Sequence, residues 1–127
     1  MNDVLEALLA LERAALDRWA RGDTLGYAEL FADDATYFDH MTRARLHGLE
    51  TVRKHVLNYQ GKINIPRHEI VDPVVHHDGN LGVLVFNWDP YGPDGQRLPR
   101  WNATSVYRRV GGSWRIVHAH WAVAAGS

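Results

Sequence analysis

The spacing of hydrophobic residues changes once along this chain, and that change limits the possible folds more than any other feature. Up to about residue 60, apolar residues recur at steps of three and four, which is typical of amphipathic helices. Beyond Gly61 the period becomes two, in segments rich in β-branched and aromatic residues, which is typical of strands. Helices followed by a run of strands predict an α+β fold.

The first part of the chain predicts three helices and one short strand. Asn2 or Asp3 can cap the first helix, and Gly22 is a natural stop after it. The last helix places His55 and Tyr59 on the same inward face as two valines. In chain order, the predicted elements are helices over Asn2–Arg21 and Leu25–Phe31, a strand over Ala35–Asp39, and a helix from Gly48 to about Tyr59.

The second part predicts an antiparallel meander. Glycine-containing turns at 78–80, 93–95 and 111–112 separate the strands and connect them as three hairpins. The predicted strands are Arg67–His77, Leu81–Asp89, Arg100–Val110 and Trp114–Val123. Because helices occur only at the start, the sheet is expected to curl over them as a cone, with a pocket between its concave face and the helices. Residues 1–127 are expected to form a single domain, with no repeat or linker.

The composition excludes several classes of partner. The net charge is −1, which gives no electrostatic signature for binding nucleic acid or an anionic membrane. The chain has no cysteine, so disulfides, thiolate nucleophiles and cysteine-ligated zinc are excluded. No apolar run approaches the roughly 18 residues that span a bilayer, and the N-terminal segment lacks the basic start of a signal peptide. These features predict a cytoplasmic protein.

Three motifs resemble a known superfamily. They are F-A-D-D-A-T-Y-F-D at 31–39, G-L-E-T-V-R at 48–53 and G-G-S-W-R-I-V-H-A-H-W at 111–121. In this order they resemble nuclear-transport-factor-two-like proteins, and within them the SnoaL-like and ketosteroid-isomerase-like members. The C-terminal half is also similar to the association domain of calcium/calmodulin-dependent protein kinase. The residues that carry this second likeness are Thr104, Val106, Arg108, Gly112, Trp114, Val117, His118 and His120.

The resemblance implies a role for Asp39, which occupies the position of the general-base aspartate of ketosteroid isomerases. In those enzymes the base works with an oxyanion hole made of a tyrosine and a protonated aspartate. Ungapped matching places Ala15 and Ser105 at those two donor positions, so the isomerase donors are not carried over. The pocket arginines of the association domains correspond to Asn87, Ser105 and Trp121, so that cationic pocket is not carried over either.

Asp39 and His55 form the first candidate site. A carboxylate beside an imidazole orients the ring and raises its basicity, which gives an acid–base pair. The alternative is that Asp39 caps a turn and His55 is a partly exposed helix residue.

The second candidate is the lining of the pocket. Strand alternation predicts an inward set of Asn87, Asp89, Trp101, Ser105, Val117, Ala119 and Trp121, with Tyr27, Tyr37 and Tyr59 closing the pocket from the helical side. Asn87 and Ser105 would donate hydrogen bonds, and Trp101 and Trp121 would form walls. Such a lining suits a small, partly apolar organic ligand, and no cofactor is expected. The alternative is ordinary core filling, and a register shift of one residue would exchange the two faces.

The opposite face is expected to be convex and to form a homodimer through His118 and His120. Phe86, Trp88, Asn102 and Thr104 are predicted to share it. A metal site built from the same two histidines with His76 and His77 is an alternative, but no third ligand has the required spacing, so no metal is expected.

Two loops leave alternatives open. The Pro90–Gly95 connection is a rigid turn, a cover over the pocket mouth, or a contact with a neighbouring subunit. Arg43, Arg45 and His47 either bind an acidic substrate, pair with Asp39, or lie on a solvated surface. Two functions remain in view: a small-molecule enzyme doing cofactor-free acid–base chemistry, and a self-associating or ligand-sensing module.

Overall fold

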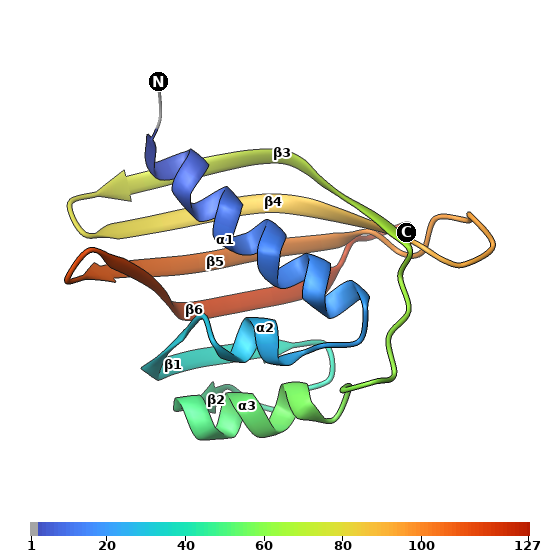
Figure 1. Cartoon of the computed structure of the whole chain (residues 1–127), viewed down its shortest axis with the longest axis horizontal. Helices are drawn as coiled ribbons and strands as arrows, with labels where there is room; N and C mark the ends of the chain where they lie inside the picture. Colours follow the sequence, from blue (N-terminus) through green and yellow to red (C-terminus); the bar gives the residue numbers. More distant parts are fainter. Residues whose placement is uncertain (1–2) are drawn as a thin grey trace.

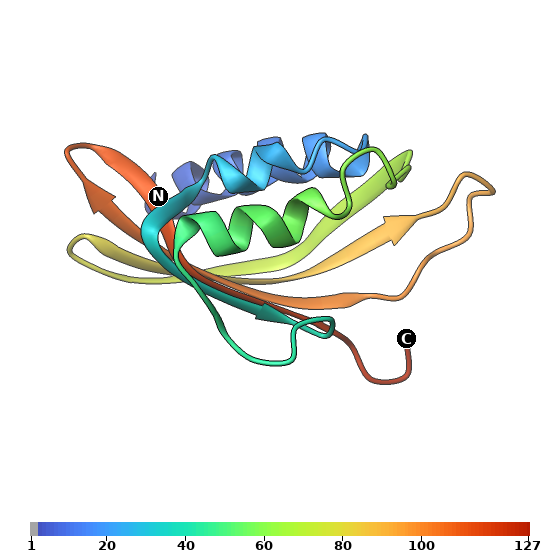
Figure 2. The same ribbon diagram turned by 90° about the horizontal axis from the view of Figure 1, so that it is seen from below.

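The computed structural model describes residues 3–127, with three helices lying on one side of a curved sheet (Figure 2). Asn2, where the sequence places the start of the first helix, lies outside the described residues. The elements are α1 (Asp3–Ala20), α2 (Leu25–Ala28), β1 (Phe31–Asp39), β2 (Leu46–His47), α3 (Leu49–Leu57), β3 (Arg67–Asp78), β4 (Leu81–Tyr91), β5 (Trp101–Val110) and β6 (Ser113–Val123).

The sheet has six strands in the order β2-β1-β6-β5-β4-β3 (Figure 1). β1 pairs with β6 in parallel, and every other neighbouring pair is antiparallel. The predicted meander is therefore confirmed, and so is the α+β cone with a mixed edge. In β3, a register shift between Val71 and Val74 contains Asp72, whose φ is 50°. Such a bulge increases local twist and bends the edge strand.

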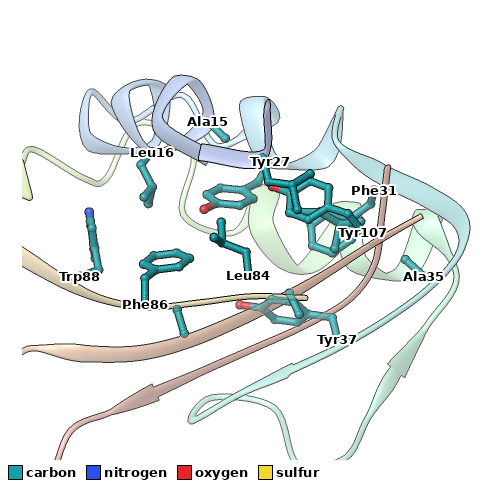
Figure 3. Close-up of a cluster of buried hydrophobic side chains, with 14 of the residues drawn as sticks. Ala15, Leu16, Tyr27, Phe31, Ala35, Tyr37, Leu84, Phe86, Trp88 and Tyr107 are labelled. Atoms are coloured by element: carbon teal, nitrogen blue, oxygen red, sulfur yellow. The ribbon is translucent and has the colours of Figure 1, made fainter. Parts of the chain in front are cut away.

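The core lies between α1 and the concave face of the sheet. Leu8 and Leu16 of α1 are almost completely buried against Leu84 of β4 and Tyr107 of β5. Figure 3 shows such side chains meeting between the helix and the strands, with Tyr27 entering from α2. This packing fixes α1 on the sheet. The helix does not cover the end of the sheet where β4 and β6 stop and β5 begins.

Two local predictions are wrong. The second helix ends at Ala28, and Phe31 begins β1 instead of ending the helix. The backbone N–H of Ile116 donates to the carbonyl of Leu30 at 2.8 Å, so pairing with β6 overrides the short helical pattern. The loop after Asp39 also contains a strand, β2, which pairs with Thr36 and Tyr37. No helix within residues 3–127 is long and apolar enough to cross a bilayer.

Candidate active site

A cavity of about 520 Å³ lies at the end of the sheet where β1, β4 and β6 stop and β5 begins. In Figure 1 this end carries the long connection between β4 and β5. We call it the aromatic cavity. It is lined by Leu16, Trp19, Tyr27, Phe31, Tyr37, Asp39, His40, Met41, Val56, Tyr59, Ile63, Ile65, Trp88, Pro90, Leu98, Pro99, Trp101, Trp121 and Val123. Pro90, near the end of β4, and Leu98 and Pro99, just before β5, belong to this lining, whereas residues 91–95 of the predicted connection do not.

Trp121 lies at the centre of the aromatic side chains in this cavity. Its ring lies 6.2 Å from that of Tyr27, 5.9 Å from Trp88 and 6.3 Å from Trp101, with interplanar angles of 86°, 85° and 71°. Edge-to-face contacts of this kind stabilise aromatic pairs beyond their buried area. The rings therefore hold one another in place and give the cavity a fixed shape.

Trp88 is also held from outside the cavity. Its indole N–H donates to Nδ1 of His68 at 3.0 Å, and Nε2 of His68 lies 2.8 Å from a carboxylate oxygen of Asp17. Because Nδ1 accepts, the ring hydrogen of a neutral His68 is on Nε2 and is donated to Asp17. This chain of hydrogen bonds connects β4 to β3 and α1.

Asp39 brings the carboxylate into the cavity, and hydrogen bonds reach both of its oxygens. Oδ2 accepts from the Tyr37 hydroxyl at 2.7 Å and lies 2.9 Å from Nε2 of His55. Oδ1 accepts from the backbone N–H of Met41 at 2.8 Å and of Thr42 at 3.2 Å. The turn that follows β1 supplies the last two donors, while β1 and α3 supply the first two.

These donors keep the carboxylate ionised. Burial acts to raise the pKa of Asp39, but the hydrogen bonds from His55, Tyr37 and the Met41 N–H outweigh it, so the pKa is lower than usual. An ionised carboxylate can only accept, so Nε2 of His55 carries the hydrogen between them. Burial, and then the charge of Asp39, raise the pKa of Tyr59, and they raise the pKa of Tyr37 well above its usual range.

A second carboxyl group, Glu12 on α1, lies in the core behind the cavity. Its side chain is fully buried, and Oε2 accepts a hydrogen bond from the Tyr27 hydroxyl. The hydroxyls of Ser105 and Tyr107 lie near enough to lower its pKa, but burial has the larger effect and raises it. Among residues 3–127, however, Oε1 of Glu12 has no hydrogen-bond partner, and neither do the hydroxyls of Ser105 and Tyr107.

The structure brings six of the predicted site residues together around the cavity. Asp39 and His55 are in contact, with only 10% and 14% of their side chains exposed. His55 does not line the cavity itself but lies behind Asp39, in ring contact with Tyr37 and Tyr59. Tyr37, Tyr59, Trp101 and Trp121 belong to the lining.

Three predicted ligand-binding residues lie elsewhere. Asn87 points to the convex face, where its side-chain amide donates to Asn102 Oδ1 and to the Trp101 carbonyl. Asp89 is buried in a two-bond ion pair with Arg100, at 2.6 and 2.7 Å. Ser105 faces inward, but beside Glu12 and outside the cavity lining.

The prediction of which β4 residues face inward is wrong, and the reason is physical. Phe86 and Trp88, expected on the convex face, are 3% and 4% exposed and pack in the core. Trp88 pairs with Trp101 across the strands, so even-numbered residues of β4 share a face with odd-numbered residues of β5. Valines occupy the convex face of β4, at 83 and 85, and an apolar pattern on both faces gives no signal for which is buried.

The predicted inward residues Trp101, Ser105, Ala119 and Trp121 of β5 and β6 share one face, but the prediction for Val117 is wrong. A register shift after Val106 leaves Val117 unpaired and places Ile116 in the core instead.

Asn102 and Thr104 lie on the convex face of β5, and the alternating residues Ala103 and Ser105 face inward. His118 and His120 both contact the ring of Phe38, at 5.1 and 4.5 Å between centroids, on the face opposite Ala119.

Two other parts of the structure concern the loop after Asp39 and the histidines. Arg43, Arg45 and His47 are exposed, and Asp39 is bonded by the backbone of this loop, not by its basic side chains. In the part of the chain that the structure describes, no group of three or more histidine, cysteine or acidic side chains could hold a metal ion.

Sequence reasoning misses Glu12 and the position of Trp19. Glu12 lies four residues after Leu8 and four before Leu16, which places it on the buried face of α1. That spacing is the signal that could have found it. The helical pattern predicts only a core position for Trp19, because its place at the last turn of α1, beside the uncovered sheet end, depends on the three-dimensional arrangement.

Comparison with known sequences identifies the family. The SnoaL-like domain pattern matches residues 13–119. The chain belongs to the SnoaL-like domain family. No curated protein matches the chain.

Solved structures agree with this assignment. A candidate ketosteroid isomerase from Parabacteroides distasonis is 31% identical, with a TM-score of 0.87 over 98% of this chain and 91% of that one. An NTF2-like protein of unknown function from Pseudomonas putida is 24% identical, with a TM-score of 0.81 over 94% and 85%. The association domain of CaMKII from C. elegans is 20% identical, with a TM-score of 0.73 over 94% and 98%. The SnoaL-like fold and its relation to ketosteroid isomerases are thus established.

Proposed function

We propose that this SnoaL-like protein binds a small organic molecule in the aromatic cavity and catalyses cofactor-free proton transfer, with Asp39 as the base. The observation that carries the proposal is the position of Asp39. It is the one carboxylate that lines this cavity among the described residues, and its pKa is held below the usual value. An ionised carboxylate against an apolar ligand is the minimal requirement for removing a proton from carbon.

The proposed reaction begins at a carbon next to a carbonyl group. Asp39 takes the proton, the C–H electron pair forms a carbon–carbon double bond, and the π pair of the carbonyl group moves onto its oxygen, which gives an enolate and a neutral carboxylic acid. Asp39 then returns the proton to another atom of the substrate. Isomerisation, dehydration and cyclisation all share this first step.

Tyr37, Tyr59 and His55 support the step in different ways. The Tyr37 hydroxyl can turn away from Oδ2 without any backbone movement, which frees a lone pair for the incoming proton. His55 keeps its hydrogen bond and holds the carboxylate in place. Tyr59 lies near enough for the charge of Asp39 to raise its pKa, and as a neutral phenol it is the proposed donor to the enolate oxygen. It takes the donor role that the strand pattern predicts for Asn87 and Ser105.

Exchange in heavy water tests this proposal without knowledge of the product. A panel of carbonyl compounds is incubated with the protein, and the loss of α-proton signals is followed by proton NMR. We expect wild-type protein to accelerate exchange of at least one compound, and Asp39→Asn to slow it by about 10²- to 10⁴-fold. Asp34→Asn, an exposed carboxylate on the same strand, is the matched control. If Asp39→Asn and His55→Ala both left the rate unchanged, the assignment would be wrong.

A second function, self-association, is favoured by the convex face. Val74 and Val85 are 49% and 39% exposed there and are paired neighbours on β3 and β4. The CaMKII association domain and a CaMKII hub from S. rosetta share the fold, with TM-scores of 0.73 and 0.74. We propose a homodimer through this face, with His118 and His120 in the contact. Such a dimer is compatible with a catalytic cavity on the opposite side of the sheet.

A further inference from the structure

We infer that the ligand of the aromatic cavity is an organic cation: a molecule with an ammonium group on an apolar body. The inference rests on the proposed function, because it assumes that this cavity is the ligand site. It adds the sign of the charge on the substrate.

The first observation is the distribution of charged side chains. Among residues 3–127, the lining of the aromatic cavity contains the ionised Asp39 and no lysine or arginine. A second hollow, the polar groove between α2, α3 and the start of β1, is different. It is lined by Arg53, Arg108 and Arg115 as well as by Glu29, Asp33 and Asp34. An anionic ligand would therefore meet the carboxylate of Asp39 with no lysine or arginine in the lining to bind it, because His55, the basic group in contact with that carboxylate, lies outside the lining.

The second observation is the chemistry of the lining. Four of the five tryptophans and three of the five tyrosines line this one cavity. Adjacent rings meet close to right angles, as Trp121 does with Tyr27 and Trp88. Rings at right angles cannot all lie parallel to one wall, so the ring planes around the cavity have different orientations. The faces of tryptophan and tyrosine attract cations by about 0.5–2 kcal/mol each, tryptophan most strongly.

Both observations select the same charge. A neutral ligand would use the apolar surface of the rings but would gain no attraction between opposite charges from Asp39. A cation gains from the ring faces and from the carboxylate, in a setting where little water screens the attraction. A positive nitrogen near the reacting carbon would also stabilise the carbanion that Asp39 produces, which makes the inferred substrate chemically suited to the proposed step.

Two probes of the same shape isolate the effect of charge. They are para-hydroxyphenyl-trimethylammonium and para-tert-butylphenol. The first has a positively charged nitrogen where the second has a neutral carbon. Binding to the whole protein is measured by calorimetry at about neutral pH, where the phenol groups of both probes keep their protons. We expect the cation to bind about tenfold more tightly, equivalent to about 1.4 kcal/mol. Asp39→Asn should remove most of that difference, and Asp34→Asn should leave it unchanged.

Trp121→Leu provides a second variant. It keeps an apolar side chain in the cavity, so it should weaken binding of the cation more than binding of the phenol. Equal or tighter binding of para-tert-butylphenol by wild-type protein would overturn the inference, and so would the absence of saturable binding of either probe at millimolar concentration.

The two proposals can fail separately. A preference for the cation without any exchange in heavy water would leave the inferred ligand class standing and refute catalysis. Exchange that occurs only with neutral or anionic carbonyl compounds would support catalysis and refute the cationic substrate.

Discussion

Asp39 and Glu12 are both carboxyl groups withdrawn from water, but their surroundings drive them in opposite directions. Asp39 receives four hydrogen bonds at the edge of a cavity, and its pKa is lowered. Glu12 receives one regular hydrogen bond in the core, and its pKa is raised. The balance between burial and donors therefore decides the charge: burial prevails at Glu12, and the donors together prevail at the partly buried Asp39. It also separates the two roles, because an ionised group at a cavity can take a proton while a buried one is structural.

The largest expected effect comes from removing Glu12. Glu12→Ala would leave a cavity and would remove the acceptor of the buried Tyr27 hydroxyl, next to the hydroxyls of Ser105 and Tyr107. We expect the free energy of unfolding, measured in urea, to fall by about 2–4 kcal/mol. Glu12→Gln keeps the shape and stays neutral, so it should cost less than about 1 kcal/mol. Equal losses in the two variants would show that the negative charge of Glu12 is required in the core.

Asp39→Asn should have a smaller effect on stability, and one that depends on pH. The pKa of Asp39 in the folded protein lies below its ordinary value of 3.8, so its stabilising contribution is present above that pH. The contribution is lost as the pH falls through the folded pKa. We expect wild-type protein to exceed Asp39→Asn by about 1 kcal/mol at neutral pH, after allowance for partial exposure, and the two to converge in strong acid.

Glu12 should show the opposite sign. Its folded pKa is above the ordinary value of 4.5, so its contribution is present below about that pH and is lost as the pH rises through the folded pKa. Urea unfolding of wild-type protein and Glu12→Gln across this range measures the effect. A wild-type advantage that grew with rising pH would refute the account of the core carboxyl.

Acid should also weaken the proposed homodimer. Burial, and then the neighbouring His120, lower the pKa of His118, so its protonation at mildly acidic pH places a new charge on the convex face. Sedimentation should show a dimer at neutral pH that dissociates between about pH 6 and 5. The double variant His118→Gln, His120→Gln should stay dimeric over that range. A wild-type mass that remained constant down to about pH 5 would count against this interface.

The smallest effect is expected in the polar groove. Asp34 and Arg108 form an ion pair there at 2.8 Å, with 63% and 40% of their side chains exposed. Exposed pairs contribute little to stability because water and salt screen them. Asp34→Asn should leave both the urea midpoint and the exchange activity unchanged. A clear loss of activity would indicate that the groove, and not only the aromatic cavity, takes part in function.

Most of the fold could be predicted because the sequence patterns that specify it are local. Helical spacing identified α1 and α3, glycine turns identified the hairpins, and one helix face brought His55 to Asp39. The face of β4 could not be predicted, because valines occupy one side and Leu84, Phe86 and Trp88 the other. Register across the hairpins decides between them. The polar core around Glu12 was missed because its residues come from α1, α2 and β5, and only the three-dimensional arrangement brings these elements together.

The most direct test of the central claim is native mass spectrometry of freshly purified protein, wild type beside Trp121→Leu. If the aromatic cavity is the ligand site, the wild-type protein should carry an organic adduct that the variant largely loses, and the trimethylammonium probe should displace it. An adduct of equal occupancy on both proteins, unaffected by the probe, would place the ligand elsewhere and contradict the assignment of the cavity.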